Sequence, residues 1–312
     1  MLDVTIFTNR STILEQVYME YKPDIRALID SGMIPSYPVD APLSSIPTMD
    51  FPESELDATW TFGSEVQSYY TGYGTSVNLT SALYSFKLPV TPDYIKRYST
   101  AGVAANAEND ATQAQKRINT IRKEKQLTTV MTTYTNYASG YYASPSTKWD
   151  ASSGTTILKD IHTGIKKLQL ASLPVTHMFI PLSVLTAIKF SPELHDWVKY
   201  QSMNLWSDEK LLQGLFGIPN VFIPYAATSG KVKKNKANVR TDIWGDNVVL
   251  AHIEPLALGT YPSFVNAYMI NPIVQKTTPN IETTSYEIIT RDSSYINFLH
   301  NDAAYILYDV LT

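Results

Sequence analysis

The sequence predicts an α+β fold, in which helices and strands are concentrated in different parts of the chain. Three observations support this fold class. Residues 91–126 carry apolar and small side chains at spacings near three, four and seven, which is typical of a long helix. Helix and strand patterns alternate between 155 and 252, whereas β-branched and aromatic runs dominate 59–88 and 286–310.

The N-terminal part of the sequence predicts an arm followed by an extended connector. Ser11 is placed to cap a short helix over 12–19, and a second amphipathic piece follows at 25–29. Repeated prolines between 35 and 52 exclude a regular helix or a central strand in that segment.

Residues 59–88 predict a long β-hairpin. Two β-rich runs flank the turn-like segment 71–74, which contains Gly72 and Gly74. A phosphate-binding loop would need a helix after these glycines, and another β run follows instead. Because little apolar sequence lies nearby to cover both faces, the hairpin is a candidate for packing on a neighbouring subunit.

The helix predicted over 91–126 begins at Thr91 as N-cap and Pro92 as first helical residue. Its apolar stripe is narrow and rich in alanine, and polar residues fill most of the other positions. We therefore expect this helix to lie across a sheet or a partner and not inside a core. The stripe consists of Tyr94, Tyr98, Ala101, Ala105, Ala111, Ala114, Ile118 and Ile121.

The rest of the chain predicts short alternating elements. A loop rich in Tyr, Ser, Thr and Gly covers 134–154, and the tail is expected to form strands over 286–310 with a turn at 291–293. Helices are expected over 155–170, from Pro181, from Pro192, and over 208–216 with an end at Gly217; strands are expected over 175–180, 221–224 and 248–252.

The composition suits a chain that buries much of its surface against neighbours. Charged residues make up 17% of 312 residues, whereas about a quarter is usual. Lys and Arg total 25 against 29 Asp and Glu, so the basic excess of nucleic-acid-binding proteins is missing. The 21 tyrosines fit an interface-rich protein or reflect ordinary variation in composition. The absence of cysteine excludes disulfides and thiolate sites, and no run of roughly 20 apolar residues could span a membrane.

Four pieces in a fixed order carry a family resemblance. They are an apolar strand at 173–180, a helix–turn–helix at 184–200, a helix that stops at a glycine before a strand at 211–221, and a Gly-Asp pair that leads into an apolar strand at 243–250. The ordered set resembles the major capsid proteins of tailed bacteriophages, which share the Hong Kong 97-type coat fold.

The resemblance implies a division of the chain into the parts of that fold. It assigns residues 1–37 to an N-terminal arm, 38–86 to an extended E-loop, 87–145 to a peripheral (P) domain with a long spine helix, 146–270 to an axial (A) domain, and 271–312 to strands that return to the P-domain.

The function implied by the resemblance is self-assembly into pentamers and hexamers of an icosahedral shell around double-stranded phage DNA. Inter-subunit contacts are expected at Tyr69, Tyr70 and Tyr73 near the E-loop tip, and at Tyr94 and Tyr98 of the spine helix. The expected partners are copies of the chain, a portal protein, a separate scaffolding protein or none, and a decoration protein as a further candidate. DNA would be enclosed without sequence-specific binding, no membrane is involved, and assembly in the host bacterial cytoplasm would place the protein in the virion capsid.

No motif predicts a catalytic, cofactor-binding or metal site, so neither enzyme activity nor a cofactor is expected. His177 and His252 lie in apolar strands, where a core histidine is commoner than a metal ligand. Asp208 and Glu209 suit the first turn of a helix. The lysine cluster at 231–236 is expected to be a solvated loop, with a contact to DNA phosphates or to an acidic neighbour as the alternative.

Two other functions stay open. The same fold would serve an encapsulin-like compartment that holds a protein cargo. A hydrolase would need clustered acids or histidines in one cleft, and the sequence offers no such cluster. Trp244 in the run Trp244-Gly245-Asp246 could be taken for a sugar-stacking residue, but we interpret it as a packing residue, with a turn at Gly245.

Overall fold

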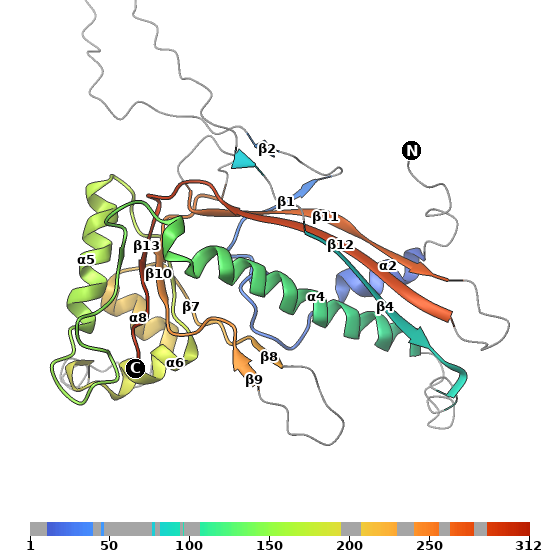
Figure 1. Cartoon of the computed structure of the whole chain (residues 1–312), viewed down its shortest axis with the longest axis horizontal. Coiled ribbons are helices and arrows are strands. Elements are labelled where there is room, and N and C mark those ends of the chain that lie inside the picture. Colours follow the sequence, from blue (N-terminus) through green and yellow to red (C-terminus); the bar gives the residue numbers. More distant parts are fainter. Residues whose placement is uncertain are drawn as a thin grey trace, which may run out of the picture.

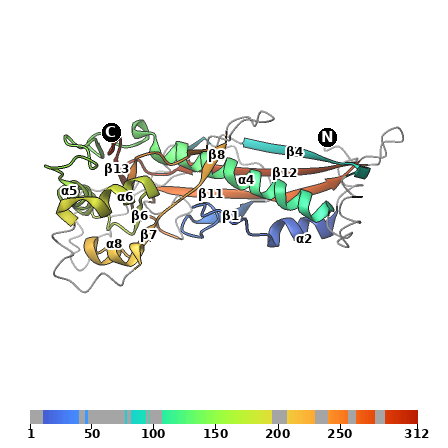
Figure 2. The ribbon, with the colours of Figure 1, turned by 90° about the horizontal axis from the view of Figure 1, so that it is seen from below.

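The computed structural model describes residues 11–39, 45–46, 77–78, 82–93, 96, 107–194, 207–229, 240–255, 263–277 and 286–312. The molecule is elongated, with a long sheet running along it and a compact group of helices around a second sheet at one end (Figures 1 and 2). The α+β class predicted from the sequence is confirmed.

The long sheet has the strand order β1-β11-β12-β4. It is formed by β1 (Ser36–Val39), β11 (Val265–Lys276), β12 (Tyr286–Phe298) and β4 (Ala82–Val90). β1 pairs with β11 in parallel, and the other pairs are antiparallel. The helix α4 (Ala107–Thr132) packs along β12 and β4, with α2 (Thr12–Glu20) beside it against β11 (Figure 1).

The second sheet, here called the end sheet, has the order β5-β13-β10-β6-β7. Its strands are β5 (Tyr142–Ala143), β13 (Ala304–Leu307), β10 (Val248–Ala251), β6 (His177–Phe179) and β7 (Asn220–Phe222). The helices α5 (Ile157–Leu170), α6 (Leu182–Phe190) and α8 (Asp208–Phe216) contribute to the core on one of its faces. Smaller elements in the described part of the chain include η1 (Tyr134–Asn136) and the antiparallel pairs β2 (Ser45–Ile46) with β3 (Val77–Asn78) and β8 (Ala227–Ser229) with β9 (Arg240–Asp242).

Local sequence signals locate several of these elements correctly. The side chain of Ser11 caps α2 by accepting a hydrogen bond from the Leu14 amide. α8 ends at Gly217, whose φ of 67° is the left-handed conformation that glycine adopts without strain. The segment 25–29, in contrast, forms no helix; Arg26 makes an isolated antiparallel bridge to Tyr225.

The predicted face of the long helix is correct at Ala111, which is buried, and wrong at the stripe residues that follow it. Ala114 is exposed, and Ile118 and Ile121 are only half-buried. The helix also ends at Thr132, beyond Gln126. Its buried face is mostly polar, because acceptors and donors from β12, α2 and the segment 28–30 meet it there. The buried polar residues are Thr112, Gln115, Asn119, Thr120, Lys123, Glu124 and Thr128.

The turn predicted at 291–293 is also wrong, because β12 runs through these residues without a break. Asp292 is buried on the face of the strand that meets α4, where it pairs with Lys123. A charged residue is stable in a central strand when such a partner is available. The chain turns later, at 299–303.

One hydrophobic cluster extends beneath both sheets. It contains Leu127 and Met131 from α4, Val249 and Ile306 from the end sheet, and Ile296 from the long sheet. Because the same side chains pack on both sheets, the two parts of the molecule share a core instead of meeting at a flexible hinge.

Candidate assembly surfaces

A buried polar network joins α2, α4 and β12. The Tyr18 hydroxyl donates to Asp292 Oδ2 at 2.7 Å and accepts from Asn119 Nδ2 at 2.9 Å. Lys123 Nζ lies 2.8 Å from Asp292 Oδ1, and both side chains are less than a tenth exposed. Burial, together with the Asp292 carboxylate, raises the pKa of Tyr18, so the phenol keeps its proton. These directional contacts fix the rotation of α4 against the long sheet.

Glu124 is fully buried at the point where three segments meet. Its Oε1 accepts a hydrogen bond from Trp244 Nε1 at 2.7 Å, and its Oε2 accepts one from the Ile29 amide at 3.1 Å. Burial raises the pKa of this carboxyl, although the hydrogen bonds oppose the shift. Trp244 is 1% exposed, and Gly245 has a φ of 62°, so the predicted packing and turn roles are confirmed.

Tyr134, Tyr142 and Tyr308 form a surface cluster, here called the tyrosine patch, in which the first two are exposed and Tyr308 is half-buried. The rings of Tyr134 and Tyr308 stack with centroids 5.0 Å apart, and Tyr142 lies 5.6 Å from Tyr134. Tyr134 is 45% exposed and Tyr142 is 36% exposed. The patch was not predicted as a contact site, although Tyr134 and Tyr142 lie in the segment recognised as rich in tyrosine.

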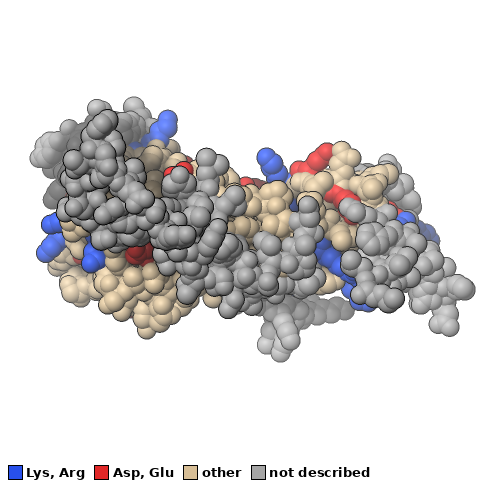
Figure 3. Space-filling model, turned by 90° about the horizontal axis from the view of Figure 1, so that it is seen from above, with Lys and Arg blue, Asp and Glu red and all other residues tan. Residues whose placement is uncertain are grey.

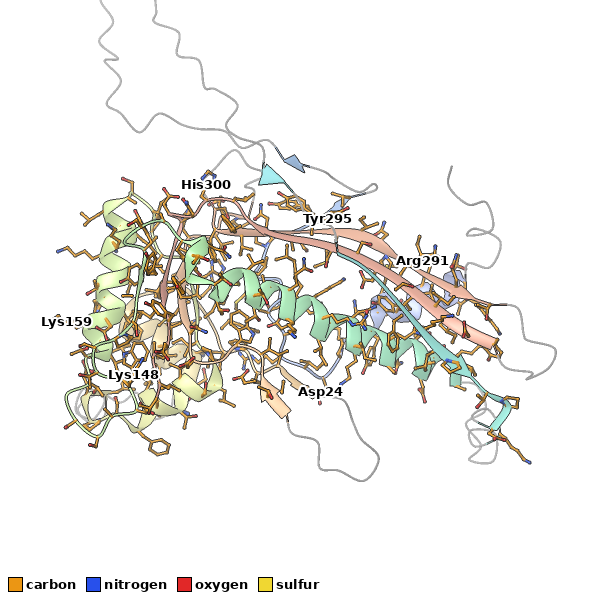
Figure 4. The ribbon with its side chains drawn as sticks, viewed as in Figure 1. Asp24, Lys148, Lys159, Arg291, Tyr295 and His300 are labelled. Carbon is orange, nitrogen blue, oxygen red and sulfur yellow. The ribbon has the colours of Figure 1, made fainter. Side chains whose placement is uncertain are left out.

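The outer side of α5 carries a second distinct surface, here called the lysine face. Lys159, His162 and Lys166 are exposed at helical spacing, and Leu170 at the end of the helix is 74% exposed. Lys159 lies at the left end of the molecule, where several blue side chains are visible (Figures 3 and 4). The one carboxylate of α5, Asp160, is only half-exposed and accepts hydrogen bonds from Trp149 and Thr156.

The tyrosine patch and the lysine face lie on opposite sides of the end sheet. α5 packs directly on one side, where a Cβ on Gly164 would come within 2.7 Å of Tyr305. Successive side chains of a strand point to opposite faces. Tyr305 and Leu307 belong to the core beneath α5, whereas Ile306 and Tyr308 pack on the opposite side with the shared cluster.

The residues predicted as inter-subunit contacts, Tyr69, Tyr70, Tyr73, Tyr94 and Tyr98, lie outside the described residues. So does the lysine cluster at 231–236. The pairing of β2 with β3 brings Ile46 opposite Val77, so it joins the two ends of the segment 47–76. This segment begins and ends about 12 residues before the hairpin predicted over 59–88, and residues 82–88 of that hairpin pair with β12 instead.

The described residues contain no group of three or more His, Asp or Glu side chains that could hold a metal ion. His177 is 7% exposed, and its Nδ1 lies 2.9 Å from the Thr176 hydroxyl. Burial lowers the pKa of His177 to about 4, so the ring is neutral near pH 7. The core role predicted for His177 is confirmed, whereas His252 is partly exposed and contacts the Pro174 carbonyl. None of the described helices is both long and apolar enough to cross a membrane.

No protein-family model and no curated protein sequence matches the chain. Solved structures match it over nearly its whole length. A phage-related protein from Bordetella bronchiseptica matches with a TM-score of 0.71 and 17% identity, over 97% of this chain and 98% of the other. The capsid of cyanophage P-SCSP1u matches with a TM-score of 0.55 and 9% identity, over 92% and 89%. The chain has the Hong Kong 97-type coat fold.

The coat fold predicted from the ordered motifs is thus confirmed. In this coat fold, α8 stops at Gly217 before β7, and Gly245 and Asp246 precede β10, as the motifs indicated. A virus-like particle from Pyrococcus furiosus also matches, with a TM-score of 0.53 and 11% identity, over 94% of this chain and 97% of the other.

Proposed function

We propose that the chain is the major capsid protein of a tailed phage and assembles into pentamers and hexamers of an icosahedral shell. The observation that carries this proposal is the match of the coat fold from end to end, including 92% of this chain against a phage capsid. The exposed tyrosine patch and the low charged fraction of the sequence fit a subunit that meets copies of itself. In this function the chain acts by assembly and has no reaction to catalyse.

The proposal assigns the parts of the molecule to the parts of the shell subunit. The long sheet with α4 would form the P-domain and its spine helix, and the end sheet with α5, α6 and α8 would form the A-domain. This assignment departs from the division implied by the resemblance, because β13, within 271–312, would belong to the A-domain and not to the strands that return to the P-domain. The segment between β2 and β3 would be the E-loop. Each contact between subunits would be of moderate strength, so that misplaced subunits detach. The large number of contacts would make the closed shell stable.

Electron microscopy and size-exclusion chromatography of the purified chain test the proposal. We expect closed shells of uniform size, formed by the chain alone or together with the assembly proteins of its phage. A compact monomer at every concentration, with those proteins present, would contradict the proposal. Deleting residues 64–76 should leave a soluble subunit that no longer forms shells, and normal shells from this variant would contradict the E-loop assignment alone.

The proposed partners inside and outside the shell follow from the same function. Double-stranded DNA would fill the shell without sequence-specific contacts, and a portal protein would be a further partner of the shell. A scaffolding protein would act during assembly in the host cytoplasm, and a decoration protein would bind the finished virion. Pull-down of these proteins with assembling subunits, followed by mass spectrometry, would identify them.

A second candidate is an encapsulin-like compartment with a protein cargo. The similarity to the virus-like particle from Pyrococcus furiosus is consistent with it, because that structure shows the same fold in a particle that is not described as a phage capsid. The contents of purified particles separate the two functions: nuclease-protected double-stranded DNA supports the phage capsid, and a single co-purifying enzyme supports the compartment.

A further inference from the structure

We propose that the tyrosine patch of one copy docks on the lysine face of the next copy, so that the end sheets form a ring. This inference rests on the proposed function and names the two surfaces that would meet within a capsomer. The patch is Tyr134, Tyr142 and Tyr308, and the face is Lys159, His162, Lys166 and Leu170, all of them in the described part of the chain.

The chemistry of the two surfaces is complementary. An ammonium group is attracted to the electron-rich face of an aromatic ring. Within its own fold the chain uses this contact repeatedly. Lys nitrogens lie over tyrosine rings at 4.3 Å for Lys276 and Tyr286, 4.9 Å for Lys116 and Tyr18, and 5.0 Å for Lys167 and Tyr141.

Charge at the edges of the two surfaces supports the same pairing. Asp309 directly follows Tyr308 and is exposed. Its Oδ2 lies 2.7 Å from Lys148 Nζ. Asp150 is fully exposed close by. This edge therefore carries two exposed carboxylates, whereas the lysine face presents two exposed ammonium groups and no exposed carboxylate. The exposed Leu170 would pack on the tyrosine rings.

The position of the surfaces favours a ring over a two-fold dimer. A two-fold contact uses the same patch on both copies, whereas a contact between two different patches is heterologous and generates a ring when the rotation between copies closes. The patch and the face lie on opposite sides of the end sheet, so every copy can use both at once.

The size of the patch indicates why single pairs of copies would separate. Complete burial of three tyrosine side chains covers at most about 750 Å². A stable complex buries about 800 Å² per partner. The contact therefore gains strength only in a closed ring, where no copy can leave without breaking two contacts.

Cross-linking tests the pairing directly, because the chain has no cysteine of its own. Tyr142→Cys and Lys166→Cys in one chain should give covalent oligomers larger than dimers when assembled particles meet a short bismaleimide reagent. Each single variant should give no product beyond dimer. The control pair, Ile13→Cys with Lys166→Cys, uses a residue of α2 that is 74% exposed. The inference is overturned if the control pair gives the same covalent oligomers as the test pair, or if the test pair gives no oligomer larger than a dimer.

Charge reversal provides the second arm. Lys159→Glu with Lys166→Glu should lower the yield of particles at least tenfold while circular dichroism and Tm stay unchanged. Lys125→Glu with Lys210→Glu changes the net charge equally at exposed lysines outside the lysine face and should assemble normally. Normal assembly of the first variant overturns the inference and leaves the proposed function standing. If the unmodified chain forms no particles even with the assembly proteins of its phage present, the proposed function is refuted, and the inference with it.

Discussion

Glu124 and Trp244, separated by 120 residues in sequence, are joined by a 2.7 Å hydrogen bond from the indole nitrogen to the carboxylate. The second oxygen of Glu124 accepts from the Ile29 amide. One buried side chain of the long helix thus holds both the N-terminal segment and the loop that precedes β10.

Removing this carboxylate should destabilise the subunit. Glu124→Ala leaves two buried donors without acceptors, and each unsatisfied donor costs about 1–3 kcal/mol. Glu124→Gln keeps one oxygen acceptor and should cost about half as much. Urea unfolding followed by tryptophan fluorescence measures both. Glu20→Ala, at an exposed position of α2, should change the free energy of unfolding by less than about 0.5 kcal/mol, and a comparable loss there would argue against a special role for Glu124.

The same residue should add a pH dependence to stability. Burial raises the folded-state pKa of Glu124 above the ordinary value of 4.5. The folded state then holds the proton more tightly, so stability falls as the pH rises from about 4.5 through the raised pKa. The difference in unfolding free energy between the unmodified chain and Glu124→Gln should shrink over that range. A difference that is constant from pH 4.5 to 8 would show that the pKa is not raised.

The buried ion pair of Lys123 and Asp292 should matter far more than a surface pair. Lys123→Met leaves the Asp292 charge buried without its partner and should cost about 3–5 kcal/mol. The comparison is Lys87→Met, which breaks the ion pair of Lys87 with Glu287. The Lys87 side chain is 65% exposed and the Glu287 side chain is 39% exposed. That change should cost less than about 1 kcal/mol. Equal costs in chemical denaturation would contradict the burial argument.

Gly164 should be required for the close packing of α5 on the end sheet. A Cβ at this position would lie 2.7 Å from Leu250 and Tyr305. Gly164→Ala should therefore lower stability by about 1–3 kcal/mol through overpacking, even though alanine favours a helix by about 1 kcal/mol. Thermal unfolding measures the loss. Thr163→Ala, at the adjacent exposed position, should be nearly neutral, and an increase in Tm for Gly164→Ala would refute the tight contact.

His177 should make the subunit sensitive to mild acid. Its pKa falls from 6.5 to about 4 on folding, because burial disfavours the charged ring and His252 lies nearby. The unfolded chain therefore takes up the proton first, and stability decreases as the pH falls from about 6.5 to 4, by up to about 3 kcal/mol. The free energy of unfolding of the unmodified chain should be lower at pH 5 than at pH 7.5. The corresponding decrease should be smaller in His177→Gln. The exposed His162→Gln should behave like the unmodified chain.

Elements with signals inside their own sequence were predictable. Ser11 and Gly217 mark helix ends because capping depends on neighbouring backbone groups. The apolar strands of the end sheet were predictable because both of their faces are buried. The coat fold followed from the order of such local pieces.

Features that depend on remote partners were not predictable. Asp292 looks like a turn residue until Lys123 and Tyr18 are placed beside it, and the polar buried face of α4 looks like a solvent face for the same reason. The tyrosine patch requires β5 to pair with β13, which brings Tyr142 close to Tyr308. Composition revealed the excess of tyrosine but could not show which tyrosines converge.

The hydrophobic cluster beneath both sheets has a mechanical consequence. Close-packed side chains resist compression, so they transmit a displacement instead of absorbing it. A displacement of the end sheet would therefore pass to α4 and to Val265 and Ile296 of the long sheet, because their side chains belong to the same cluster. Differences in curvature between flat and strongly bent regions of a shell would then be taken up by tilting whole subunits and not by bending them.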